Sequence, residues 1–395
     1  MGHTTKSSMG NDMADFNNDG LLDIMSLDMF PDDPSILKKS AGEEMMDIFD
    51  MKEQLGYYYQ LSRNALQLNR GYEVFSEIAA YSGLYATDWS WAPLFFDADN
   101  DGFKDLFITN GIPKRPNDLD YLQFIEDNAN AINSNGDDRI SNAALIEIMP
   151  SDTIMNYAFR NKRDLTFNNS AVDWGLDQKA FSNGCVYADL DNDGDLDYVV
   201  SNLYENCFIY RNNSETVSNY HFIKIELLGP EKNKNGIGAR VEVWNAGKVQ
   251  VQQMIPARGS MSSVDPILNF GIGEATTIDS ILVLWPGGFK EVKQKIEADQ
   301  TLSVNFEDGI LHETKANHHR PTFEDYTDTF DDNFRHVESR FSDFNYQTLL
   351  PHKISTMGPK MAKGDVNGDG LEDLYICGGA GQEGRLYVQK KDNRF

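Results

Sequence analysis

The stretch Asp189-Leu-Asp-Asn-Asp-Gly-Asp-Leu-Asp197 decides how this chain is interpreted, because it is one of four copies of a nine-residue pattern. The pattern is D-x-[DN]-x-D-G-x-x-D, and its copies are separated by longer segments of ordinary sequence. Recurrence of one motif along a chain indicates a repeat architecture, in which one supersecondary unit is used several times. The other copies are Asp15-Phe-Asn-Asn-Asp-Gly-Leu-Leu-Asp23, Asp97-Ala-Asp-Asn-Asp-Gly-Phe-Lys-Asp105 and Asp365-Val-Asn-Gly-Asp-Gly-Leu-Glu-Asp373.

The negative charge of the chain is concentrated in these four loops. The 395 residues include 62 acidic and 35 basic side chains, for a formal net charge of −27. The 36 loop residues hold 16 acidic side chains and one lysine, and so carry −15 of that charge. A chain this acidic is repelled by phosphate backbones and anionic lipid, so we expect neither a nucleic-acid partner nor a membrane-surface partner. The loops need cations instead.

The spacing of oxygen donors in the loops is typical of calcium sites. Side chains at positions 1, 3 and 5 of a tight loop point inward, position 7 offers its backbone carbonyl, and a later carboxylate completes the shell. Glycine at position 6 permits the sharp turn. An ion-free polar turn is the alternative, and four copies weigh against it. We therefore predict calcium as the cofactor, with these ligands: Asp15, Asn17, Asp19, Leu21, Asp23, Asp97, Asp99, Asp101, Phe103, Asp105, Asp189, Asp191, Asp193, Asp195, Asp197, Asp365, Asn367, Asp369, Leu371 and Asp373.

The loops are not EF-hands. An EF-hand needs a glutamate at position 12 and a helix on each side. Position 12 here is Ser26, Ile108, Val200 or Ile376, and short β-prone runs flank the loops, such as Cys185-Val-Tyr-Ala188 before the third loop. We therefore predict a strand, the loop and a second strand as the repeating unit.

This unit resembles the FG-GAP (VCBS-type) repeat, whose fold is the calcium-decorated β-propeller of integrin α subunits. The resemblance covers about residues 10–215 and again 340–395, and includes flanking text such as Asn69-Arg-Gly-Tyr-Glu-Val-Phe75 and Trp174-Gly-Leu176. It implies propeller blades, and propellers close with four to eight of them. Three loops before residue 215 cannot define a closed ring. We expect a partial ring in a piece of a larger protein, with a signal peptide outside the given sequence.

Residues 218–306 have a different pattern. Alternating runs such as His221-Phe-Ile-Lys-Ile-Glu-Leu227 and Ser280-Ile-Leu-Val-Leu-Trp285 are separated by Gly, Asn and Pro turns, which predicts a small β-sandwich or barrel. Gly236-Ile-Gly-Ala239 and Trp285-Pro-Gly-Gly288 resemble the ASPIC/UnbV domain, which follows FG-GAP repeats in the cartilage acidic protein family and in many bacterial surface proteins. Arg258-Gly259-Ser260 is not an RGD ligand, and we predict a β-turn there.

The predicted fold class is therefore all-β: partial propeller blades with helical insertions, the small β-domain, and the start of a second propeller. The predicted ranges are 1–215, 218–306, an acidic linker over 307–340, and 341–395. Periodic apolar residues predict the helical insertions at 41–65 and 117–160. His318-His319 in the linker form a candidate metal pair, although the absence of a third ligand favours a solvated linker.

Membrane insertion and a disulfide framework are not expected. The sequence has no apolar run of about 18 residues, and Met1 to Gly10 lack the apolar core of a signal peptide. Three cysteines do not make a framework; Cys185 and Cys207 either pair or, as we favour, are small buried residues.

The sequence favours a non-enzymatic function. It contains no nucleophile elbow, zinc motif, phosphate loop or dinucleotide fingerprint. We expect a calcium-binding extracellular or cell-surface protein that binds a protein or glycan, because exposed loops of this type are too weak for cytosolic calcium. The alternative is a carbohydrate-active enzyme or lyase on a calcium-stabilised propeller, with Trp89, Trp91 and Tyr57–Tyr59 either stacking on sugars or filling the core.

Overall fold

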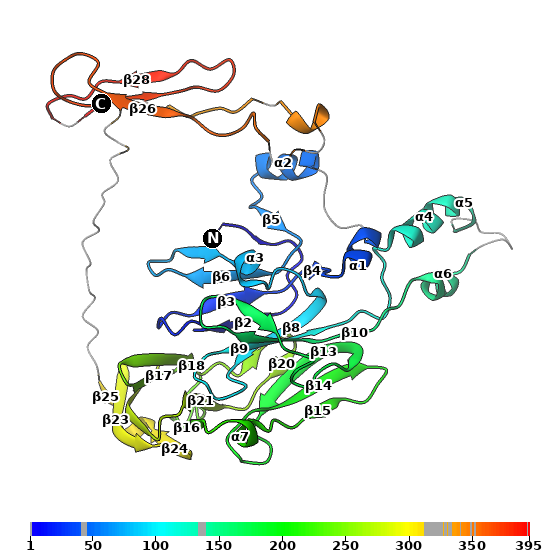
Figure 1. Cartoon of the computed structure of the whole chain (residues 1–395), viewed down its shortest axis with the longest axis vertical. Helices are drawn as coiled ribbons and strands as arrows, with labels where there is room; N and C mark the ends of the chain where they lie inside the picture. The colour runs from blue at the N-terminus through cyan, green and yellow to red at the C-terminus, as the bar shows by residue number, and fades with distance from the viewer. Residues whose placement is uncertain are drawn as a thin grey trace. The chain divides into compact units, whose positions relative to one another are not determined.

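The structure is a computed structural model of the whole chain. It describes residues 2–40, 46–132, 140–311, 327, 330, 334–339, 341–347, 350, 353–392 and 394–395. The chain divides into two compact units, Met1–Thr314 and Lys315–Phe395, which we describe separately. Strands make up most of the regular structure, which confirms the predicted all-β class (Figure 1).

Each of the first three loops connects neighbouring antiparallel strands of its own sheet, as predicted. Ala14, for example, pairs with Asp23 across the first loop, and Phe96 pairs with Asp105 across the second. In sheet order, the first sheet is β2 (Asn11–Ala14), β3 (Asp23–Ser26), β6 (Ala65–Asn69) and β7 (Phe75–Glu77); the second is β12 (Phe167–Asn169), β11 (Tyr157–Asn161), β9 (Asp105–Asn110), β8 (Asp88–Phe96) and β4 (Met29–Phe30); the third is β10 (Ile154–Met155), β13 (Lys179–Ala188), β14 (Asp197–Leu203) and β15 (Phe208–Tyr210).

The repeat sheets share apolar cores between their faces. Phe16, at position 2 of the first loop, is fully buried, and its ring lies 6.0 Å from that of Phe95 in the second sheet. Phe96 in the second sheet lies 4.6 Å, edge to face, from Tyr198 in the third. Because neighbouring sheets meet through these rings, burial of apolar area holds the loops at the same end of adjacent sheets.

The helices confirm the predicted insertions only in part. The first insertion contains α2 (Met46–Gln54), and the second contains α4 (Leu119–Asp127), α5 (Ala129–Ile132) and α6 (Asn142–Ile148). Residues 154–155 and 157–160 were predicted as helix and are strand, because β10 pairs with β13 and β11 pairs with β9, and the pairing overrides the weak apolar period. Residues 60–61 likewise form β5 (Gln60–Leu61), which pairs with β1 (Thr4–Thr5). The other helices are α1 (Pro34–Lys39), α3 (Ala79–Ser82) and α7 (Ser214–Val217).

The predicted small β-domain consists of two sheets around one core. Its buried residues include Ile223, Val241, Phe270 and Ile281, which come from both sheets. One sheet has the order β21 (Ile267–Gly273), β16 (His221–Leu228), β24 (Gln300–Asn305); the other has β18 (Lys248–Gln253), β17 (Arg240–Asn245), β22 (Thr277–Leu284), β23 (Phe289–Glu297), β25 (Ile310–Leu311). Since β25 pairs with β23, residues 310–311 belong to this sheet, inside the range predicted as linker.

A hairpin of the β-domain reaches the repeat sheets. Strands β19 (Ala257–Arg258) and β20 (Ser262–Ser263) enclose the turn predicted at Arg258-Gly259-Ser260, with Gly259 at φ 70°. The Arg258 guanidinium donates to both carboxylate oxygens of buried Asp12 in β2, at 2.7 and 2.8 Å, and to the Tyr187 hydroxyl in β13 at 2.7 Å. One arginine therefore joins the β-domain to the first and third sheets.

The second unit contains one three-stranded antiparallel sheet. Its order is β26 (Met361–Gly364), β27 (Asp373–Ile376), β28 (Arg385–Tyr387), and the fourth loop joins the first two strands. A short 3₁₀ turn, η3 (Asp343–Asn345), precedes it, and another, η1 (Phe306–Asp308), follows β24 in the first unit. The predicted histidine pair His318-His319 lies outside the described residues. The three cysteines are free thiols, Cys185 buried and Cys207 exposed, so they do not pair.

We predict that Arg258→Gln destabilises the first unit by about 3–5 kcal/mol, because it leaves the buried Asp12 carboxylate without its counter-charge. Urea unfolding followed by circular dichroism measures this free energy. The double variant Asp12→Asn with Arg258→Gln removes both charges and should lose less stability than the single variant. A single variant within about 0.5 kcal/mol of the wild type, the usual range for surface substitutions, would contradict the role of this pair.

Candidate metal sites in the repeat loops

All four loops share one internal geometry. In the first, the Asp15 carboxylate accepts the backbone N–H groups of Asp19 and Gly20, at 3.0 and 2.9 Å. Equivalent bonds to the position 1 carboxylate form in the other loops. Position 4 adopts the left-handed conformation, as at Asn100 (φ 57°), and so does the glycine at position 6, as at Gly194 (φ 100°). These φ values explain why only asparagine or glycine occupies position 4 and only glycine position 6.

The carboxylate at position 9 connects three strands of its sheet. In the second loop, Asp105 Oδ2 accepts the N–H of Ala98 at 3.1 Å, and Oδ1 accepts the N–H of Asn161 in β11 at 2.8 Å. The same pair of bonds forms at the ninth position of the other three loops. Position 9 was predicted as a calcium ligand, and the structure gives it a second role as a structural acceptor. Each carboxylate oxygen has a further lone pair, so the two roles are compatible.

Asparagine side chains join neighbouring repeats. Asn18 Nδ2 in the first loop donates to the Gly102 carbonyl in the second at 2.8 Å, and Asn100 Nδ2 donates to the Gly194 carbonyl in the third at 3.3 Å. At the end of the third strand of a repeat, Asn161 donates to the Phe16 carbonyl at 2.9 Å. The first three loops therefore form one connected row.

Sequence reasoning missed these third-strand asparagines. Asn69, Asn161 and Asn212 all donate through Nδ2 to the carbonyl at position 8 of their own loop. A signal was available, because each follows a short β-prone run that leads away from its loop. Their distance from the loop in sequence differs from repeat to repeat, which hides the regularity.

Three groups of carboxylates come close enough to share a cation. They are Asp97, Asp99 and Asp101; Asp189, Asp191 and Asp197; and Asp193, Asp195 and Glu215, with one oxygen from each member within 4.8 Å of the others. In the described residues, loops one and four form no such trio, because asparagine stands at position 3.

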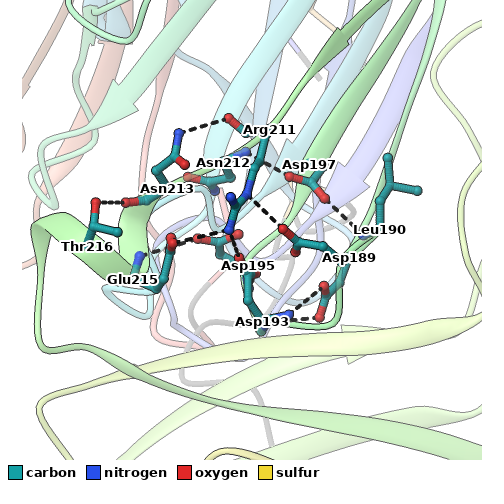
Figure 2. A network of polar contacts seen from close by, with 12 residues as sticks. Asp189, Leu190, Asp193, Asp195, Asp197, Arg211, Asn212, Asn213, Glu215 and Thr216 are labelled. Atoms are coloured by element: carbon teal, nitrogen blue, oxygen red, sulfur yellow. Dashed lines mark hydrogen bonds and ion pairs between the residues drawn. The ribbon is translucent and has the colours of Figure 1, made fainter.

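The third loop offers an oxygen that a cation would satisfy. Asp195 is 1% exposed, and its Oδ1 has no hydrogen-bond partner in the described structure. Its Oδ2 accepts the Ser214 hydroxyl at 2.9 Å. Figure 2 shows this carboxylate among Asp193 and Glu215. Oxygen donors of this kind suit a hard divalent cation, so the residues present fit calcium. Glu215 lies in α7, outside the repeat, and sequence reasoning did not identify it.

Burial makes these carboxylates difficult to ionise without a cation. Burial raises the pKa of Asp15 to about 6 and the pKa of Asp23 to about 7, and nearby Asp19 adds to both shifts. Burial likewise raises the pKa of Asp97 and of Asp195 to about 7. The cause is the loss of hydration, which penalises the charged form.

Basic side chains counter part of this charge. Lys224 of β16 contacts the Asp189 carboxylate, and both side chains are buried. Lys104, at position 8 of the second loop, is buried, and its Nζ lies 5.6 Å from the centre of the Phe270 ring in β21. Burial lowers the pKa of Lys104, whereas nearby Asp97 raises it. Both lysines therefore connect the loops to the β-domain.

Two arginines pair with position 3. Arg160 Nη2 lies 2.5 Å from Asp99 Oδ2, and Arg211 Nε lies 2.7 Å from Asp191 Oδ2. Each arginine directly precedes the third-strand asparagine or its equivalent. The first and fourth repeats have Leu68 and Val388 there, together with asparagine at position 3. In every repeat, the side chains at positions 1, 3, 5 and 9 and the residue before the third-strand asparagine or its equivalent together carry a formal charge of −3.

The β-domain contacts all three loops of the first unit. Arg240 Nη2 donates to the Gly20 carbonyl at 2.8 Å, and Gly273 N–H donates to the Asn100 carbonyl at 3.0 Å. A Cβ on Gly271 would lie 2.2 Å from Asp97 Oδ2, and one on Gly194 would lie 1.8 Å from the Phe222 ring. The contact therefore requires glycine on both sides.

The aromatic residues singled out for sugar stacking have other surroundings. The Trp91 indole donates to the Gly111 carbonyl at 2.8 Å, and Tyr57–Tyr59 are exposed beside α2. The ligand role predicted for the position 7 carbonyls of Leu21, Phe103 and Leu371 stays a prediction. Their N–H groups donate to the carboxylate at position 5.

We predict that the calcium-free protein loses stability as the pH rises from about 4 to about 7. The folded pKa values of Asp15, Asp23, Asp97 and Asp195 lie above their unfolded values near 3.9, so the folded state binds more protons in this window. The free energy of unfolding should fall by up to about 1.4 kcal/mol per pH unit for each titrating carboxyl. Urea titrations in excess chelator measure it, and calcium should reduce the fall. A free energy that rises across this window in chelator would contradict the burial of these groups.

Comparison with known proteins gives a domain-level result. The described helices include none with the length and apolar character needed to cross a membrane. The curated proteins contain no match to this chain. Residues 229–310, which run from the end of β16 to β25, match the family described as ASPIC and UnbV, and this match confirms the resemblance predicted for the β-domain.

Proposed function

We propose that this chain is a non-enzymatic, calcium-stabilised binding protein of FG-GAP type that works outside the cytoplasm. The observation that carries the proposal is the shared geometry of the four loops. In each, carboxylates at positions 1, 5 and 9 face a turn closed by left-handed asparagine or glycine residues. Three trios of carboxylates lie within ligand distance of a common cation.

Calcium would supply the positive charge that this arrangement lacks. The position 1, 3 and 5 side chains would hold it, and the first two repeat sheets would be fixed relative to each other because their loops are bonded in a row. The β-domain contacts the same loops, so its docking depends on the loops keeping their conformation. This supports a scaffold whose rigidity depends on calcium.

The proposed location rests on the calcium affinity expected of such loops. We propose that loops without a position 12 glutamate bind calcium as weakly as extracellular modules, at about 10⁻⁴–10⁻³ M. Such sites fill outside the cytoplasm. We propose an extracellular protein or glycan as the partner, and the three repeat sheets as the platform.

Calcium should raise the melting temperature of the chain. A site at 100-fold its dissociation constant adds about 2.7 kcal/mol to the free energy of unfolding. Calorimetry in chelator, in magnesium and in rising calcium measures the shift. We expect a rise in calcium and a smaller one in magnesium, which demands stricter octahedral geometry.

A matched pair of variants tests where the ion binds. Asp101→Asn alters a predicted ligand of the second loop and should reduce the calcium-dependent shift. Asp164→Asn alters an exposed aspartate outside the loops and should leave the shift unchanged. If the wild type has the same melting temperature in chelator as in calcium, the calcium assignment is refuted.

A further inference from the structure

A cavity lies between the second and third repeat sheets, beside their loops. Its volume is about 510 Å³, within the range of small-molecule sites. The second repeat contributes Asp99 and Arg160, and the third contributes Tyr198, Tyr210 and Arg211. None of the residues singled out for sugar stacking from the sequence lines it. The cavity adjoins the loops' candidate cation sites and shares Asp99 with one of them.

The lining combines aromatic faces with polar groups. Trp174, Tyr198, Tyr210 and Tyr220 contribute rings, and Asn212 contributes an amide. Tyr198 is 5% exposed, yet its hydroxyl has no hydrogen-bond partner in the described structure. That hydroxyl is inaccessible to a water-sized molecule and the ring packs on Phe96 and Phe107, so Tyr198 offers the cavity part of its ring and not a hydrogen bond. Aromatic faces beside hydrogen-bonding groups suit the two kinds of surface on a saccharide ring.

The two arginines of the lining add a charge preference. The Arg160 and Arg211 side chains are 49% and 58% exposed. Each contacts the position 3 aspartate of its own loop, and Arg211 also reaches Asp193 at 3.1 Å (Figure 2). A guanidinium group binds a carboxylate through paired hydrogen bonds, so either arginine can accept the carboxylate of a ligand when its own aspartate is engaged elsewhere.

Calcium in the loops would control whether these arginines can bind a ligand carboxylate. On the proposed function, Asp99 and Asp191 ligate calcium through the oxygens that Arg160 and Arg211 now contact. Arg160 then shares the Asp99 carboxylate with the ion. Arg211 shares Asp191 but keeps Asp193 and Glu215 within reach at 3.1 and 3.5 Å, so both guanidinium groups are held less tightly by their own loops. Both remain at the cavity wall, where Asp99 and Asp173 are the other charged residues, so engagement of Asp99 by calcium shifts the charge of the wall in the positive direction.

We propose that this cavity binds an acidic saccharide, one that carries a carboxylate on a sugar ring, and that calcium in the second and third loops switches the binding on. This inference rests on the proposed function and adds a ligand class and a dependence on calcium. The aromatic rings take the sugar face, and Arg160 and Arg211 take the carboxylate. Nucleic acid is disfavoured as a ligand, because the net charge of the chain is −27.

Titration calorimetry with digalacturonate and its dimethyl ester tests the proposal. In calcium, the acid should bind at least about tenfold more tightly than the uncharged ester. In chelator with magnesium, binding of the acid should weaken by a similar factor. Combining Arg160→Gln with Arg211→Gln should remove the preference for the acid. Arg70→Gln is the matched control, because Arg70 is an exposed arginine of the first repeat that does not line the cavity.

A second variant tests the switch itself. Combining Asp99→Asn with Asp191→Asn installs the residue that the first and fourth repeats have at position 3. It should free Arg160 and loosen Arg211, which keeps Asp193 and Glu215, and so allow digalacturonate to bind in chelator.

Calcium binding is measured on the same samples, so that the two proposals fail differently. Calcium uptake without digalacturonate binding, or with equal binding of acid and ester, would overturn the cavity assignment and leave the proposed function standing. Absence of calcium uptake by the wild-type chain would overturn both.

Discussion

The structure depends on the carboxylate at the ninth loop position. Its two oxygens accept N–H groups from position 2 of the loop and from the third strand, at Asp23, Asp105, Asp197 and Asp373 alike. One side chain therefore fixes the conformation of the loop and the position of its own strand relative to the neighbouring third strand. Because these bonds need an ionised carboxylate among other carboxylates, the fold creates a demand for positive charge.

That demand explains why basic side chains of the β-domain contact carboxylates of the repeats. The domain supplies Lys224 to the third loop and Arg258 to Asp12 of the first sheet. It also contacts all three loops at places where the domain or the loop has a glycine. Arginines within the repeats balance the extra aspartate at position 3. Charge neutralisation thus comes in part from inside the protein, where a basic residue is within reach, and the proposed calcium would supply the rest.

The sequence was sufficient for the strand-loop-strand unit and for the identity of the β-domain, because both are encoded by short local patterns. The helical insertions were predicted only in part, since residues of β11 are more stable paired with β9 than in the helix that their apolar spacing indicated. Lys224 and Arg258 were out of reach, because each acts on a residue in a segment distant in sequence. The pairing of arginine with aspartate at position 3 was visible only after the third strands had been aligned by structure.

A crystal structure grown in calcium, with anomalous diffraction data, tests the central claim most directly. The account predicts anomalous density inside the loops at Asp15, Asp97, Asp189 and Asp365, with the position 3 and position 5 side chains turned toward it. Lys224 should then have withdrawn from Asp189. Loops that contain no anomalous density, with Lys224 still on Asp189 and the arginines still on position 3, would show that the protein balances these charges without calcium.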